Sequence, residues 1–369
     1  MAQLARELIE EATRYRVVVL TTIEAQHSMS DLISQYEAVR NGGAGLIDLS
    51  SRGRITVGGT EAVMFLNGLI TNDMKTLEEH HWMPAAFPNV QGRLIAAVRV
   101  IRLANETEKS PRFLLDTEAA THQAVLKTIE RFTMAGDFRV TDITGTTATL
   151  SLQGRQGAEI ARKVFGDSLA QLDRNGVAET NWNAANVTVV RSSHTGEDGF
   201  DIVVDSTLSD DLSQALIDAG AVFVHDDTLE TLRIEAGIGH FGQDMDETNV
   251  ITEVNLDDAI SFTKGCYLGQ EIIIRIKHRG HVAKKLTGLT FDDRENVDVG
   301  AIIKSGEGKD IGRITSTAYS PLLAKTIALG YVRYEHLASD TEVVVGENGI
   351  EAKVTDLPFV RGSWYEDEV

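Results

Sequence analysis

The sequence is poor in the residues that mark secreted and membrane proteins. It contains one cysteine in 369 residues, so no disulfide can form within the chain, and we expect a reducing, cytoplasmic location. It has no run of about 18 apolar residues, the length that a membrane-spanning helix needs. The N-terminal stretch MAQLARELIEEATRY contains acidic residues and lacks the apolar core of a secretion signal; it predicts a short amphipathic helix instead.

Basic residues are also scarce, and two common motifs of nucleotide-binding proteins and hydrolases are absent. There are 35 Lys and Arg residues against 55 Asp and Glu residues, a formal charge of −20, so we expect no direct DNA binding. Neither the phosphate-binding pattern G-x-x-x-x-G-K-S/T nor the nucleophile pattern G-x-S-x-G is present. GIGHFG at 237–242 follows a predicted helix instead of opening one, so we interpret its glycine spacing as coincidence.

The charge that is present is unevenly distributed. Residues 197–258 hold 17 acidic residues and one base, Arg233, whereas residues 264–285 hold six bases and one acid, a net charge of +5. A run of charge is often a solvated face. It can also be an electropositive mouth for an anionic ligand. The sequence leaves both interpretations open.

Strand-like and helical patterns divide the chain into two parts. Up to about residue 285, short apolar runs alternate with amphipathic helices, including one after a predicted Thr60 N-cap and one predicted to begin at Asp227 and end at Gly237. After that point about six short strands follow, with Asn348-Gly349 as a two-residue hairpin turn. We therefore predict an α+β fold with two lobes in residues 1–285, divided near residue 145, and a small β-barrel in residues 286–369.

The only cysteine, Cys266, lies in the segment FTKGCYLGQEIII. A free cysteine is most often a buried small apolar residue. Here Gly265 leaves the backbone open and Lys264 is two residues away, and a nearby cation favours a reactive thiolate. The spacing to His278 and His281 matches no standard metal site, so we predict no bound metal. One thiol also cannot hold an iron–sulfur cluster, which typically takes four.

Two further residues are candidates for ligand binding. Glu197 lies in SSHTGEDGFDIVV, an acid-rich glycine turn between two predicted strands. The turn is either a surface hairpin or a rigid mount for a carboxylate, which can accept two parallel N–H bonds from an amidine-like edge such as that of a pterin. Arg233 is either a surface arginine or a cation reserved for an anion.

These segments together resemble a known family. TGEDGFD and DDTLETLRIEAGIGHFGQDMDE are similar to parts of the glycine cleavage T-protein, the tetrahydrofolate-dependent aminomethyltransferase, and GLIDLSSRGRITVGGTEAVMFLNGLITNDM is similar to its N-terminal segment. KGCYLGQE matches the K-G-C-Y-x-G-Q-E signature of the YgfZ branch of that family. The signature residues are Lys264, Gly265, Cys266, Tyr267, Gly269, Gln270 and Glu271.

The resemblance implies a fold, a ligand and a role. It implies three lobes around a central folate site, with tetrahydrofolate as the ligand. The basic segment 264–285 would attract the polyglutamate tail of such a folate. By motif position, Glu197 would receive the pterin edge and Arg233 would lie near the folate. In the YgfZ branch the implied role is the assembly or repair of iron–sulfur enzymes, including those that methylthiolate tRNA. The partners would be iron–sulfur proteins or their assembly machinery, and Cys266 would be the key residue.

The sequence departs from the T-protein pattern where the chemistry would occur. Ala96 and Ala97 stand where the pattern G-G-I-I-D-D-L has its acids, and His194 replaces an aromatic residue. Alanine cannot hold a proton or stabilise developing positive charge. Three hypotheses follow: a folate-binding accessory protein acting through Cys266, a folate-dependent aminomethyltransferase or demethylase with an acid from elsewhere, and a folate-binding scaffold in which Cys266 only packs.

Overall fold

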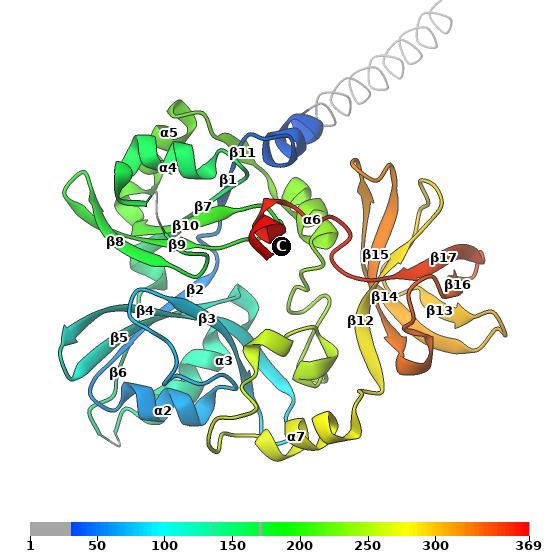
Figure 1. The fold of residues 1–369 in the computed structure, drawn as a ribbon, viewed down its shortest axis with the longest axis horizontal. Coiled ribbons are helices and arrows are strands. Elements are labelled where there is room, and N and C mark those ends of the chain that lie inside the picture. The colour runs from blue at the N-terminus through cyan, green and yellow to red at the C-terminus, as the bar shows by residue number, and fades with distance from the viewer. Residues whose placement is uncertain (1–30, 135, 170–171, 369) are drawn as a thin grey trace, which may run out of the picture.

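The computed structural model describes residues 31–134, 136–169 and 172–368, and the helix predicted at the extreme N-terminus lies outside them. Residues 31–40 are helical and lead into the first strand. Figure 1 shows two α+β lobes and a barrel placed around a central region. The helix α6 (Asp226–Glu235) lies in this region, and α7 (Gln270–Arg279) runs along the edge of the first lobe toward the barrel. No helix among the described residues is long and apolar enough to cross a membrane.

The first lobe is a five-stranded sheet with two helices packed on one face. Its strands, in the order β3-β4-β5-β2-β6, are β2 (Gly53–Gly58), β3 (Trp82–Pro88), β4 (Leu94–Thr107), β5 (Ser110–Thr117) and β6 (Arg139–Asp142). Side chains alternate along β4, so Ala96, Val98 and Val100 pack into one core with α2 (Ala62–Leu69) and α3 (Ala119–Glu130). Further along the strand, Arg99, Ile101 and Leu103 face the second lobe: Arg99 pairs with Asp201, and the other two pack in one cluster with residues of that lobe.

The second lobe contains a six-stranded sheet. Its strands, in the order β11-β1-β7-β10-β9-β8, are β1 (Gly45–Asp48), β7 (Thr147–Gln153), β8 (Val177–Trp182), β9 (Ala185–Arg191), β10 (Gly199–Asp205) and β11 (Val222–Val224). The helices α4 (Gly157–Phe165) and α5 (Ser209–Asp218) pack on it. Because β1 pairs with β7 and β11, the N-terminal part of the chain belongs to the second sheet although it precedes the first lobe in sequence.

The third lobe is a closed six-stranded barrel, as the turn-separated strand pattern predicts. Its strands, in the order β12-β15-β14-β13-β16-β17, are β12 (Lys284–Thr290), β13 (Ile302–Ser305), β14 (Asp310–Ser320), β15 (Lys325–Arg333), β16 (Glu342–Val345) and β17 (Ile350–Thr355). Val345 pairs with Ile350, so the loop between the last two strands has four residues, 346–349, and the prediction of a two-residue turn is wrong. Gly349 has φ +70° in this loop, a conformation that glycine adopts without strain. The predicted α+β fold with a C-terminal barrel is confirmed.

Two predicted helix caps are wrong by one or two residues. Helix α2 begins at Ala62 with Glu61 at the N-cap, because the Glu61 carbonyl accepts the first i→i+4 bond, from the Phe65 N–H at 3.0 Å, while the Thr60 N–H donates to Asp137 Oδ2 at 2.8 Å. Helix α6 begins at Asp226, with His225 at the N-cap. Asp227 therefore lies in the first turn, where the helix dipole favours acids.

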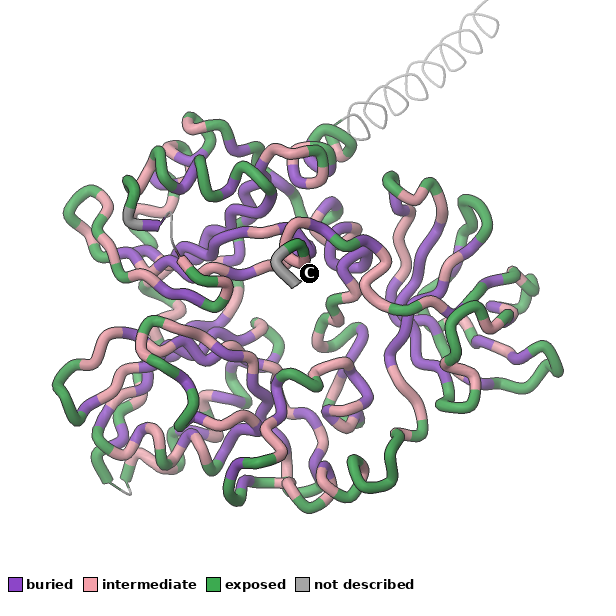
Figure 2. The backbone as a smooth tube through the Cα atoms, viewed as in Figure 1, coloured by how far each residue is buried: buried purple, intermediate pink, exposed green. Residues whose placement is uncertain are grey.

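The buried backbone follows the strands of both sheets and the barrel, as Figure 2 shows, whereas α7 is largely exposed. A separate apolar cluster joins the first lobe to the barrel. It includes Ala86 and Leu94 from the first sheet, Leu286 and Leu329 from the barrel, and Tyr267 from the loop before α7. This junction cluster, as we call it below, is the apolar wall beside the central region.

Candidate functional site

The loop before α7 presents the only cysteine to solvent. Lys264 and Tyr267 are buried, and Gly265, Cys266 and Leu268 are exposed. The two buried side chains also contact each other, because Lys264 Nζ lies 5.0 Å from the centroid of the Tyr267 ring. The thiol is therefore held between two anchors, and the interpretation of Cys266 as a buried packing residue is wrong.

Lys264 fastens this loop to the first lobe. Its Nζ donates to the carbonyl oxygens of Asn67, Ile70 and Asn72 at 2.7, 2.9 and 2.6 Å, at and just beyond the C-terminal end of α2. A cation is favourable at a helix C-terminus. Burial lowers the pKa of the Lys264 ammonium group to about 8. The ammonium group thus donates its hydrogen bonds to backbone carbonyls. These contacts do not support the prediction that Lys264 is the counter-charge of the thiol.

The remaining signature residues shape the start of α7. Gly269 has φ +74°, and a Cβ atom there would lie 2.3 Å from the carbonyl oxygen of Asn89, so glycine is required. Gln270 Nε2 donates to the Gly265 carbonyl at 3.3 Å. Glu271 pairs with Arg275 at 2.6 Å on the exposed face of the helix. These contacts hold the motif in place, with Cys266 exposed between its anchors.

The basic segment 264–285 is largely paired within the fold. Four bases besides Lys264 have partners within the described residues: Arg275 with Glu271, Lys277 over the Phe262 ring, Lys284 over the Tyr331 ring, and Lys285 with Asp257. The last turn of α7 also holds Lys277 and Arg279, where the helix dipole favours cations. Lys277 and Lys285 also line a cleft of about 360 Å³ between α7 and the barrel, together with Asp257, so an electropositive mouth for an anion stays a prediction.

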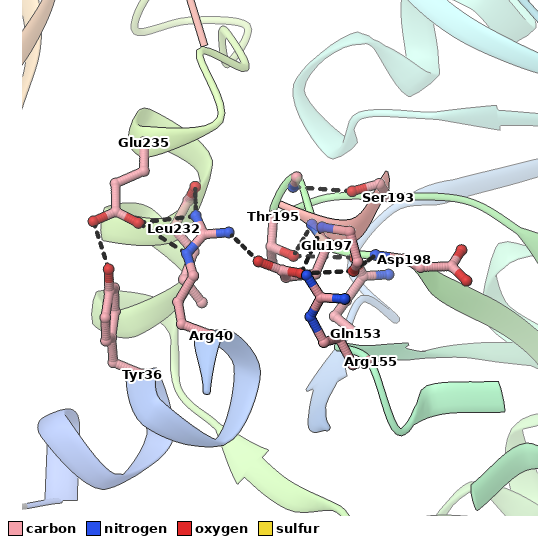
Figure 3. Close-up of polar contacts among 12 residues, drawn as sticks. Tyr36, Arg40, Gln153, Arg155, Ser193, Thr195, Glu197, Asp198, Leu232 and Glu235 are labelled. Atoms are coloured by element: carbon pink, nitrogen blue, oxygen red, sulfur yellow. Dashed lines mark hydrogen bonds and ion pairs between the residues drawn. The ribbon is translucent and has the colours of Figure 1, made fainter. Parts of the chain in front are cut away.

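Glu197 is buried, and both of its carboxylate oxygens are occupied. Oε1 accepts from Arg40 Nη1 at 2.9 Å (Figure 3). Oε2 accepts from the backbone N–H and the hydroxyl of Ser363, at 2.8 and 2.6 Å. The backbone of the C-terminal segment comes so close that a Cβ on Gly362 would lie 2.4 Å from Oε1. The alternative of a solvated surface hairpin is therefore wrong, and the carboxylate holds the end of the chain.

Arg40 connects Glu197 to a second buried carboxylate, Glu235 of α6 (Figure 3). Its Nε and Nη2 donate to Glu235 Oε2 at 3.0 and 2.8 Å, and Glu235 Oε1 accepts from Tyr36 and from Ser320 of the barrel at 2.7 and 2.5 Å. Burial opposes the charge on Arg40, but the two carboxylates outweigh it and raise its pKa above the ordinary value. This network joins the 31–40 helix, the Glu197 turn, α6 and the barrel.

Arg233 is buried as well, so it is not a surface arginine. Its guanidinium group donates to Glu230 at 2.5 and 2.6 Å, to Asp244 at 2.8 Å and to Ser316 Oγ at 3.0 Å. The Ile238 carbonyl accepts the remaining hydrogen bond at 2.9 Å. Groups of the chain itself therefore occupy its donors, and proximity to a folate stays a prediction.

Ala96 and Ala97 lie on opposite faces of β4. Ala96 is buried in the core of the first lobe, whereas Ala97 packs against the junction cluster, on the side of the central region. Arg99 follows on the same face as Ala97 and reaches Asp116 and Asp201 at 2.7 and 2.5 Å. Of the two alanine positions, only that of Ala97 could present a catalytic group to the central region.

A buried ionic cluster that the sequence analysis missed joins the two sheets. Asp201 of β10 accepts from Arg99 and contacts His194 Nε2 at 2.9 Å, while Asp116 accepts from Arg99 and from Arg52. Burial would raise the pKa of Asp116, but the two arginines lower it to about 2. The pKa of Asp201 is likewise held well below its ordinary value against burial, by the charges of His194 and Arg99. An acid within the apolar strand GFDIVV is the one local feature that could have indicated this cluster.

Comparison with known proteins places the chain in a family. The model of the GCVT N-terminal domain matches residues 8–264, and that of the glycine cleavage T-protein C-terminal barrel domain matches residues 284–361. The aminomethyltransferase of Rubrobacter xylanophilus is 30% identical over 329 residues, covering 89% of this chain and 86% of the relative. That of Thermotoga neapolitana is 30% identical over 339 residues, with 90% and 91% covered.

A solved structure agrees with the sequence matches. The crystal structure of glycine cleavage system aminomethyltransferase T from Bartonella henselae aligns with a TM-score of 0.82 and 26% identity, covering 89% of this chain and 90% of that chain. The first family model alone spans more than half of the sequence, and the second spans the closed barrel. The chain therefore belongs to the glycine cleavage T-protein family.

Proposed function

We propose that this protein binds tetrahydrofolate and supports the assembly or repair of iron–sulfur enzymes, including those that methylthiolate tRNA, through Cys266. The observation that carries the proposal is the exposed thiol, fixed between the buried Lys264 and Tyr267 in a segment that matches the YgfZ signature. A surface thiol held in a fixed loop is available for reaction or for metal ligation with a partner.

Family membership supports the folate ligand. The relatives named aminomethyltransferase match nearly the whole chain, so the lobes that surround the central region are all present. For Glu197 to receive the pterin edge, the C-terminal segment has to move. The N–H and O–H donors of Ser363 occupy one carboxylate oxygen, and the pair of N–H groups on a pterin edge offers donors of the same kind. Arg40 would stay in place as the ion-pair partner of the carboxylate.

The residues of the chain support a role without aminomethyl transfer. Alanine at position 97 offers no proton acceptor to the central region. Cys266 can provide one sulfur to an iron held by a partner, and since a cluster typically takes four thiolates, the partner would bring the metal and the other ligands. The folate would then act as ligand, and the thiol would act on the partner.

A second candidate is a tetrahydrofolate-dependent aminomethyltransferase or demethylase. The identity of 30% to two aminomethyltransferases favours it, and so does the His194–Asp201 pair, which could move a proton in place of the missing acid. The scaffold hypothesis assumes that Cys266 only packs within the fold, and the exposed thiol argues against that assumption.

The proposal is tested first by calorimetry with tetrahydrofolate. We expect the wild type and Cys266→Ala to bind it with the same affinity, because the thiol is exposed and makes no contact that holds the fold among the described residues. Absence of binding by the wild type would refute the folate half of the proposal. A Cys266→Ala variant that loses folate binding would show that the thiol belongs to the folate site and not to a site for a partner.

A further inference from the structure

Tyr267 carries a buried hydroxyl group that has no hydrogen-bond partner among the described residues. The residue is 7% exposed, although its neighbours Cys266 and Leu268 are exposed. Burial raises the pKa of the phenol to about 12. A buried hydroxyl without a partner costs free energy, because it has lost water and gained no hydrogen bond. Phenylalanine would fill the same space without that cost, so the hydroxyl group requires an explanation.

The other buried tyrosines of the described chain are paired. The Tyr36 hydroxyl donates to Glu235 Oε1 at 2.7 Å, and the Tyr331 hydroxyl donates to the Asp244 carbonyl at 2.8 Å. Tyr331 even belongs to the same junction cluster as Tyr267. Among the described residues, the hydroxyl groups of Tyr36 and Tyr331 thus have acceptors, whereas the hydroxyl group of Tyr267 has none.

The position of this phenol is informative. Tyr267 lies in the apolar cluster between the first lobe and the barrel, and Ala97 packs against the same cluster. Position 97 is the one of the two alanine sites that faces the central region. The unpaired hydroxyl and the position from which an acid is missing therefore belong to one apolar cluster beside that region.

We infer that the Tyr267 hydroxyl group is a direct hydrogen-bonding contact for tetrahydrofolate at this wall, an inference that rests on the proposed function. A flat heterocycle suits such a place, because its faces can pack on apolar side chains such as Ala97 while polar atoms at its edge reach a hydroxyl group. A phenol can both donate and accept, so it can pair with a ring N–H or with a carbonyl oxygen. Since Cys266 is the adjacent residue, this contact also links the ligand directly to the loop that carries the thiol.

The test is Tyr267→Phe, which removes only the oxygen. Two quantities are measured: the affinity for tetrahydrofolate by calorimetry, and the thermal midpoint of the ligand-free protein. We expect about tenfold weaker binding, because one hydrogen bond to a buried ligand group is lost. The midpoint of the ligand-free variant is expected to be equal to or higher than that of the wild type, because an unpaired buried group has been removed.

Tyr331→Phe is the matched control, since it removes a paired hydroxyl from the same cluster. It is expected to lower the midpoint and to leave the affinity unchanged. Equal affinity of Tyr267→Phe and the wild type overturns the inference. So does a fall in the ligand-free midpoint of Tyr267→Phe like that of the control, because the hydroxyl then has a partner before the ligand binds. A wild type that binds no tetrahydrofolate refutes the proposed function itself, and this inference with it.

Discussion

Replacing Ser363 with alanine tests whether the C-terminal segment competes with a ligand for Glu197. The Ser363 hydroxyl donates to Glu197 Oε2 at 2.6 Å and accepts from the Asp198 N–H at 2.9 Å. A hydrogen bond to a charged group contributes about 1.5–3 kcal/mol. The change should therefore weaken the docking of the segment by about 2 kcal/mol, while the Arg40 pair with Glu197 stays intact.

If a pterin edge has to displace this segment, that weakening appears as tighter ligand binding. One factor of ten in affinity corresponds to about 1.4 kcal/mol, so we expect Ser363→Ala to bind tetrahydrofolate about tenfold or more tightly than the wild type. Calorimetry measures the difference, and Ser363→Thr, which keeps the hydroxyl group, is the control expected to bind like the wild type. Unchanged affinity of Ser363→Ala would show that Glu197 anchors the end of the chain and does not receive the ligand.

The remaining predictions concern binding, turnover, salt and acid. Glu197→Ala should weaken tetrahydrofolate binding by at least about tenfold in the same calorimetric assay, and unchanged affinity would remove the residue from the site. With an aminomethyl-loaded lipoyl carrier protein and tetrahydrofolate, no formation of methylenetetrahydrofolate is expected, and turnover of about 1–10³ per second would favour the second candidate function. Pentaglutamyl folate should bind more tightly than the monoglutamate at low salt, with the advantage lost at high salt, because the cations of 264–285 are screened over about 8 Å at physiological salt; equal affinities would exclude this segment as the tail site. Because the pKa of Asp116 falls from 3.8 to about 2 on folding, its ionised form should contribute about 2 kcal/mol of stability above pH 3.8, lost as the pH falls through 2. Unfolding midpoints of the wild type and Asp116→Asn should therefore converge in that window, and a constant difference would argue against this origin.

The parts of the fold that depend on local pattern could be predicted from the sequence. Alternating apolar residues identify the barrel strands, because period-two burial is visible in neighbouring residues. Asn348-Gly349 marks the correct hairpin, but its loop spans four residues, of which only the two glycines have a positive φ. The N-cap of α2 was mispredicted by one residue, at a position whose contacts are long-range. The Thr60 N–H is claimed by Asp137, which is 77 residues away in sequence.

The interaction partners of the predicted site residues could not be predicted from the local sequence. The sequence left open whether Glu197 lies on a solvated hairpin or is a rigidly held carboxylate, because its partners Arg40 and Ser363 are 157 and 166 residues away. Lys264 was assigned to the thiol because of its position two residues before it. Its hydrogen bonds instead reach α2 and the residues just beyond it, more than 190 residues earlier. Short-range spacing indicates which residues are exceptional, and only the tertiary fold decides which groups they bind.

The central claim is that Cys266 acts on iron–sulfur enzymes, and its most direct test is the level of methylthiolated tRNA in cells that lack the native protein. The cells carry the wild type, Cys266→Ala, or Leu268→Ala as a control for another exposed side chain in the same loop. The account predicts full methylthiolation with the wild type and the control, and a loss with Cys266→Ala although that variant is folded and binds tetrahydrofolate. Full restoration by Cys266→Ala would contradict the account.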